Sequence, residues 1–180
     1  MNTGFVTPRI RTLAKVSAVF TTIVMCLIPI LYGVSWLIPG WEKTFPQEHY
    51  RQSGPPSIWL LTGVFILRGI LALVLVLVLY WLRRMLLRVS GGQLFGREQV
   101  VALRWAGILL VVRELLRPVI NTLVVLLASS GNPPGHRVLE ITVGLTSETL
   151  LSLVAGVVII LLSYLLAEAR RISDENAAIV

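Results

Sequence analysis

The chain has 180 residues, of which 56% are hydrophobic and 14% charged, and its mean hydropathy is +0.83. Soluble domains are about half apolar and about a quarter charged, so this composition excludes a soluble globular enzyme and a disordered tail, and the single Cys26 excludes a disulfide scaffold. The formal net charge is +7, and in so apolar a chain this favours the lipid surface over nucleic acid as the anionic partner.

Four long apolar blocks predict membrane-spanning helices, since a crossing needs about 20 mostly apolar residues. The blocks cover about 16–38, 58–82, 102–127 and 142–167. The first carries no charge and has no cleavage site after it, so we expect a permanent anchor rather than a signal peptide. Pro29 within it predicts a kink or packing notch, although membrane helices also tolerate proline.

The connections between the blocks are short and rich in turn residues, such as Pro39-Gly40 and Pro133-Pro134-Gly135. Short connections favour antiparallel neighbours, and the spans leave no room for a separate soluble domain. The sequence therefore predicts a single domain over 1–180. Its expected fold class is an all-α integral membrane four-helix bundle with up-down-up-down topology.

Lysine and arginine outside the spans indicate the orientation, because they are enriched in cytoplasmic segments. Most of them lie in the N-terminal tail, the loop 83–101 and the tail 168–180: Arg9, Arg11, Lys15, Arg83, Arg84, Arg88, Arg97, Arg170 and Arg171. We therefore expect a multi-pass protein of the cell inner (cytoplasmic) membrane with both termini in the cytoplasm.

The third span carries charges that oppose its insertion into lipid. An ionised side chain near a helix centre costs about 2.5–3.5 kcal/mol, so Arg113, Glu114 and Arg117 together cost roughly 9 kcal/mol. The Leu, Ile and Val residues between Ile108 and Leu127 return only roughly 6 kcal/mol on the same scale. We expect that this helix cannot stand alone in lipid and that neighbouring helices shield its charges.

Helical spacing predicts how these charges meet. Glu114, Arg117 and Asn121 share one helix face. In the fourth span Gly144, Glu148, Ser152 and Gly156 recur every four residues, a pattern typical of close helix contact within the chain or between copies. We predict that Glu148 approaches Arg117 or Arg113 and that Arg68 approaches Glu114. The predicted intramembrane cluster comprises Arg68, Arg113, Glu114, Arg117, Asn121 and Glu148.

This cluster has two interpretations, which the sequence leaves open. It is either a structural network of ion pairs that fixes the register of the helices or a site for an anion, a proton or a polar ligand.

Two segments on the expected cytoplasmic side resemble each other when aligned on Glu98 and Glu175. In each, a small residue, Gly96 or Ser173, fits a helix N-cap, with an acid in the following turn. The bundle can then be described as two helical hairpins in parallel orientation, each ending in this motif. The alternative is that the two segments are two ordinary helix starts. The motif residues are Phe95, Glu98, Gln99, Ile172, Glu175 and Asn176.

These motifs resemble the bacterial membrane family called domain of unknown function 2975. The resemblance rests on Gly92, Leu94, Phe95, Glu98, Gln99, Val100, Leu103, Arg104, Gly107, Ile172, Glu175, Asn176, Ile179 and Val180. Gln99 is a departure, because the family more often has Asn there. The family is similar in length and in its four predicted spans, and it has no established activity. Its members often occur beside small helix-turn-helix regulators, which implies a membrane-bound regulator of a transcription factor.

The sequence contains no metalloprotease, P-loop, nucleophile-elbow or dinucleotide-binding motif, so we expect no enzyme and no cofactor. His49 and His136 lie in separate loops without the spacing of metal ligands, so we expect no metal. Three functions remain: a binding and regulatory protein with a cytoplasmic partner, a small transporter or channel subunit using the intramembrane Arg and Glu residues, or, least favoured, an intramembrane enzyme based on Glu114, Glu148 or Ser152. A homo-oligomer remains open, and direct nucleic-acid binding is not expected.

Overall fold

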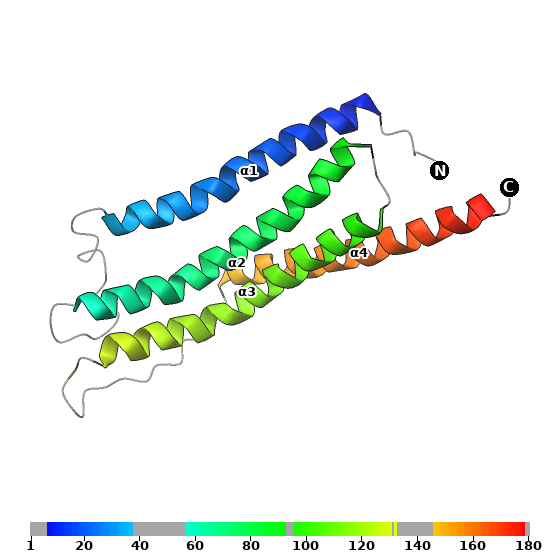
Figure 1. The fold of residues 1–180 in the computed structure, drawn as a ribbon. Coiled ribbons are helices and arrows are strands. Elements are labelled where there is room, and N and C mark those ends of the chain that lie inside the picture. Colours follow the sequence, from blue (N-terminus) through cyan, green and yellow to red (C-terminus); the bar gives the residue numbers. More distant parts are fainter. Residues whose placement is uncertain (1–6, 38–56, 93–95, 131, 133–145, 179–180) are drawn as a thin grey trace.

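A computed structural model of the chain describes residues 7–37, 57–92, 96–130, 132 and 146–178. They form four α-helices in chain order: α1 (Pro8–Leu37), α2 (Ile58–Ser90), α3 (Arg97–Ser129) and α4 (Ser147–Ala178). Successive helices run in opposite directions, so α1 begins and α4 ends at the same end of the molecule (Figure 1). The predicted all-α, up-down-up-down fold is confirmed.

All four helices are longer than the predicted spans, and the added turns lie mostly at the end where α1 begins and α4 ends, here called the basic end. Much of the expected loop 83–101 is helix, because α2 continues to Ser90 and α3 starts at Arg97. The expected tail 168–180 is helical to Ala178. At about 1.5 Å per residue these helices exceed a hydrocarbon core of about 30 Å, so charged turns extend beyond it.

Local sequence explains where the helices start. Pro8 occupies the first position of α1, where its missing N–H is not needed and its fixed φ suits a helix. Ser57 caps α2, since its hydroxyl accepts a hydrogen bond from the backbone N–H of Leu60 at 3.3 Å. Gly96 is the N-cap residue of α3, as predicted.

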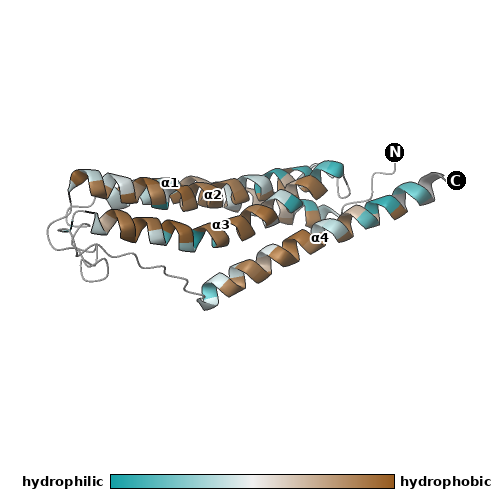
Figure 2. Cartoon of the chain, turned by 90° about the horizontal axis from the view of Figure 1, so that it is seen from below, coloured by the Kyte–Doolittle hydropathy of each residue, from teal (hydrophilic) through white to brown (hydrophobic). Residues whose placement is uncertain are grey.

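Three helices are long and apolar enough to cross a membrane by length and composition: α1, α2 and the part of α4 up to Ile172. Apolar residues dominate their middle turns (Figure 2). The helix α3 does not reach this apolar composition, because Arg113, Glu114 and Arg117 interrupt it. It instead packs between two apolar neighbours, which fits the expectation that it needs partners.

The helices pack in chain order rather than around a closed centre. The main contacts are those of α1 with α2, α2 with α3 and α3 with α4. The two terminal helices therefore form the edges of an open row. Figure 2 shows α4 diverging from α3 toward the end where α4 begins.

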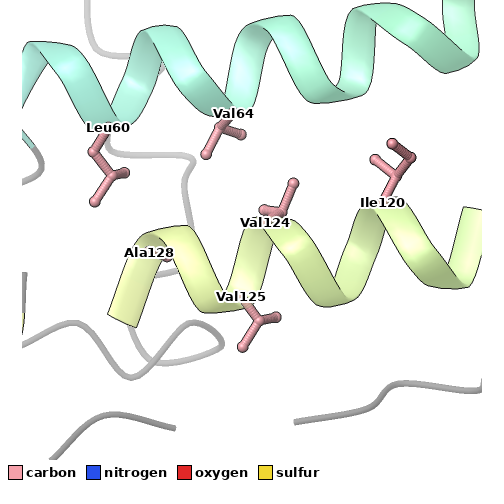
Figure 3. Packing of buried hydrophobic residues seen from close by; sticks show 6 residues of the cluster. All are labelled: Leu60, Val64, Ile120, Val124, Val125 and Ala128. Carbon is pink, nitrogen blue, oxygen red and sulfur yellow. The ribbon is translucent and has the colours of Figure 1, made fainter. Parts of the chain in front are cut away.

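The best-packed apolar cluster joins α2 and α3 (Figure 3). It consists of Leu60, Val64, Ile120, Val124, Val125 and Ala128, all nearly inaccessible. Except for Val125, these residues are spaced four apart along each helix and line up on one stripe. The two stripes pack against each other. Contact with α2 therefore holds the C-terminal half of α3, the half from which α4 diverges.

The contact between α1 and α2 combines small, aromatic and polar residues. Ala14 and Ala18 are buried against α2. The Tyr32 hydroxyl donates a hydrogen bond to the Phe65 carbonyl at 2.6 Å, and the two rings stack at 4.6 Å. Arg83 donates from Nε to the Thr22 hydroxyl at 2.7 Å. These contacts fix the register of the first hairpin.

We predict that Gly92→Ala destabilises the turn after α2. Gly92 has a φ of 92°, and an added Cβ would lie 2.8 Å from an Nη atom of Arg11. A left-handed conformation costs a side-chain-bearing residue about 1–2 kcal/mol, so thermal unfolding in detergent should begin at a lower temperature. Gly91→Ala is the matched control, because Gly91 has an ordinary φ of −76°. An equal effect of both changes would contradict this account of the turn.

Candidate functional site

The centre of the candidate site is Glu114, whose side chain is completely buried in the middle of α3. Arg113 contacts one of its carboxylate oxygens, and Nη1 of Arg117 lies 3.5 Å from the other. Two guanidinium groups of the same helix therefore flank the carboxylate. A buried charge is tolerated only when it is paired in this way.

Arg117 also links α3 to α4, because its Nη2 lies 3.9 Å from Oε2 of Glu148. This is one of the two pairings predicted for Glu148. The side chain of Glu148 is nevertheless 85% exposed, so this pairing does not bury it. Glu148 lies in the first turn of α4, where the helix dipole favours a negative charge.

The arginines that the structure places against Glu114 are Arg113 and Arg117, and the predicted approach of Arg68 to Glu114 stays a prediction. Arg68 is an exposed residue of α2, preceding Gly69, on which the ring of Tyr32 packs. Asn121 is half-buried on the same face of α3 as Arg117 and makes no side-chain hydrogen bond within the described ranges.

A proline next to this cluster was not among the residues singled out from the sequence. Pro118 lies inside α3, four residues after Glu114. Because proline has no N–H, the carbonyl of Glu114 lacks its usual helical donor. The Thr122 hydroxyl donates to the carbonyl of Pro118 at 2.9 Å. The charged group therefore coincides with a weakened point of the helix backbone, which an acid followed four positions later by proline could have indicated.

Two glycines allow α3 and α4 to approach closely beside the charges. A Cβ at Gly107 would lie 2.9 Å from the carbonyl oxygen of Gly156, and one at Gly156 would lie 3.2 Å from that of Gly107. The Gly156 end of the predicted small-residue stripe thus serves packing within the chain. Gly144 lies outside the described residues.

Near the basic end, the guanidinium of Arg104 lies 4.4 Å from the ring centroid of Tyr164, a cation–π contact between α3 and α4. Trp81 of α2 and Trp105 of α3 stack at 6.4 Å. No partner was predicted for Arg104 from the sequence. Tyr164 is an aromatic candidate on α4, but the register of α4 relative to α3 could not be derived from the sequence.

The first copy of the repeated motif forms a compact helix start. Glu98 pairs with Arg84 at 3.5 Å and also contacts Arg88, so the start of α3 is tied to the end of α2. Gln99 is completely buried. Phe95 lies outside the described residues.

The second copy is not a helix start. Ser173 lies inside α4, so its predicted N-cap role is wrong, and this motif gives no support to the proposed repeat of two hairpins. The physical reason is that α4 continues without interruption into its charged end. Ile172 is 50% exposed, and Glu175 pairs with Arg171 at 3.3 Å. The side chain of Asn176 lies outside the described part of the chain.

Within the described ranges no group of three potential metal ligands occurs, and both histidines lie outside these ranges. A family model described as "Protein of unknown function (DUF2975)" matches residues 7–180. This match confirms the resemblance inferred from the two motifs. No curated protein and no solved structure matches the chain.

Proposed function

The chain belongs to the DUF2975 family of proteins of unknown function, and on this premise we propose that it is a non-enzymatic membrane protein that binds and regulates a cytoplasmic protein. Its apolar helices anchor it in the cell inner membrane with both termini in the cytoplasm. The charged ends of the helices contact the partner, and a small helix-turn-helix regulator is the partner that the family resemblance implies.

The observation that carries this proposal is the charged extension of α4, defined here as residues 168–178. It projects past the neighbouring ends of α2 and α3 at the basic end (Figure 1). Its ion pairs are internal: Arg171 lies 2.8 Å from Glu168 and 3.3 Å from Glu175. A helix with this composition is suited to water, and its exposed Ile172 offers an apolar anchor among charges.

A second supporting feature is the rigid platform beside this extension. Glu98 holds the start of α3 against Arg84 and Arg88 of α2. A fixed group of charges at the expected cytoplasmic surface favours specific recognition of an oppositely patterned surface.

The test is co-purification of a tagged protein from native membranes in mild detergent, followed by identification of soluble partners. We expect a soluble protein to be retained by the wild type and largely lost in Ile172→Ser, because an exposed apolar anchor is removed. Deleting the gene should also change transcript levels of neighbouring genes.

Ala169→Ser is the matched control, because Ala169 is exposed on the same extension and the change also adds a hydroxyl. It should retain the partner. Absence of any soluble partner from the wild-type sample would refute the proposal. Equal loss in both variants would argue against Ile172 as the anchor.

The buried Glu114 and its arginines favour a second candidate, a small transporter or channel subunit. Ionisable groups within membrane helices often mark ion or substrate pathways. Solute or ion flux into vesicles containing the purified protein tests this function. Flux that changes in Arg117→Gln or Glu148→Gln would support it, whereas no flux above that of empty vesicles would exclude it.

A further inference from the structure

The polar groups of α3 lie opposite its exposed apolar stripe. Val112 and Val119 are exposed and seven residues apart, so they mark one face of the helix. Asn121 lies nine positions after Val112, which at about 100° per residue places it on the opposite face. Arg117 shares that face. The side chain of Arg117 is 36% exposed, although α3 lies between two packed neighbours, α2 and α4.

The start of α4 presents an acid on this same side of the row. Glu148 approaches Arg117, and Ser152 and Ala155 follow it on one face at spacings of four and seven. Both are only half-buried. Val157 lies nine positions after Glu148, on the opposite face of α4, and is 59% exposed. The start of α4 thus has a polar side, with the acid Glu148 beside Arg117 and the hydroxyl of Ser152 on the same face, and an apolar side opposite it.

Acyl chains cannot satisfy this polar side. An ionised side chain exposed to lipid near the middle of a span costs about 2.5–3.5 kcal/mol, whereas the apolar side around Val157 suits lipid. Glu148 is in the first turn of α4 but lies level with Arg117, which is well inside α3. Glu148 is 85% exposed, and within the described residues its ion pair to Arg117 is 3.9 Å long. A further polar surface is needed to cover it.

We propose that a second copy of this chain covers this side, so that the protein forms a two-fold dimer across Arg117 and Glu148. Copies in one membrane share an orientation, so their two-fold axis runs along the membrane normal and partner atoms lie at equal depth. In such an interface each residue of a contact occurs once on each side. Arg117 and Glu148 fit such an interface. They carry opposite charges, so each can pair with the other residue of the second copy. They also lie within ion-pair distance in one chain, so they lie at one depth.

The geometry of the dimer follows from what each helix has already used. Gly156 is engaged with Gly107 of the same chain, so the tight glycine contact is not the dimer interface. The available surface is the side of α4 that carries Glu148, Ser152 and Ala155. Arg117 of one copy then lies near Glu148 of the other as well as near its own.

Cross-linking between single cysteines tests this arrangement in native membranes. Cys26→Ser removes the chain's single cysteine, and Ser152→Cys or Val157→Cys then introduces a new one on either side of α4. With a short thiol cross-linker, we expect Ser152→Cys to give several-fold more covalent dimer than Val157→Cys. Ala155→Cys lies on the same side as Ser152 and should behave like it, which keeps the test valid if one variant fails to insert.

A second measurement addresses the charges. The mass of the protein in lipid nanodiscs should correspond to a dimer, and Glu148→Gln should shift it toward the monomer. Glu175→Gln, which removes an exposed acid at the basic end, should leave the dimer intact. A monomeric wild type, or Val157→Cys cross-linking as strongly as Ser152→Cys, would overturn the proposal and leave lipid headgroups or another protein to cover this side.

Discussion

Replacing Glu114 with glutamine is expected to destabilise the protein by about 3–5 kcal/mol. The side chain is completely buried between Arg113 and Arg117, and removing its charge leaves two guanidinium groups without their shared counter-ion. Breaking a buried pair from one side costs more than the pair contributes, because the remaining charge stays out of water. Denaturant unfolding in detergent micelles, followed by helical circular dichroism, measures this loss.

The matched control is Glu168→Gln. Glu168 also pairs with an arginine, Arg171 at 2.8 Å, but both side chains are more than half exposed. Exposed pairs contribute about 0–1 kcal/mol, so the control should unfold almost like the wild type. Similar unfolding of the two variants would mean that Glu114 is not a structural charge, and the ligand-site interpretation of the cluster would then gain weight.

The second large effect is expected for Gly107→Ala. The added Cβ would lie 2.8 Å from a side-chain carbon of Ile160 and 2.9 Å from the carbonyl oxygen of Gly156. The backbone of α4 cannot yield as a side chain can, so the two helices must separate. Overpacking of this kind costs about 1–3 kcal/mol, and the resulting wider spacing would also lengthen the contact between Arg117 and Glu148.

Gly33→Ala provides the control of opposite sign. Nothing lies within 4 Å of a Cβ added at Gly33, which is inside α1. Alanine in a helix interior is about 0.5–1 kcal/mol more favourable than glycine, so this variant should be slightly more stable. The same unfolding measurement compares the two, and a stabilised Gly107→Ala would contradict the close approach of α3 and α4.

The number and order of the helices could be predicted because the apolar blocks are long, even where charges interrupt the third. Their ends could not be predicted from hydropathy, since a helix does not stop where the apolar residues stop. Residues such as Arg84 and Arg88 favour the helix and continue it into water. The same continuity explains why Ser173, which fits a cap by its spacing, lies within α4.

The pairing of charges was predictable only in part. Gly156 packs against α3 as its spacing suggests, and Glu148 reaches Arg117 from the edge of that contact. Depth along a helix does not reveal rotation about its axis, so the sequence could not decide which arginines contact Glu114. Arg113 and Arg117 lie one and three positions from Glu114 on the same helix. They therefore reach its carboxylate whatever the rotation of the neighbouring helices.

The close approach of α4 to α3 at Gly156 divides α4 into two arms of unequal length. From Gly156 to Glu148 is about 12 Å, and from Gly156 to Glu175 about 28 Å, at 1.5 Å per residue. A tilt about that point would displace the outer arm more than twice as far as the inner one. A small shift at Glu148 would then be accompanied by a larger one in the charged extension of α4.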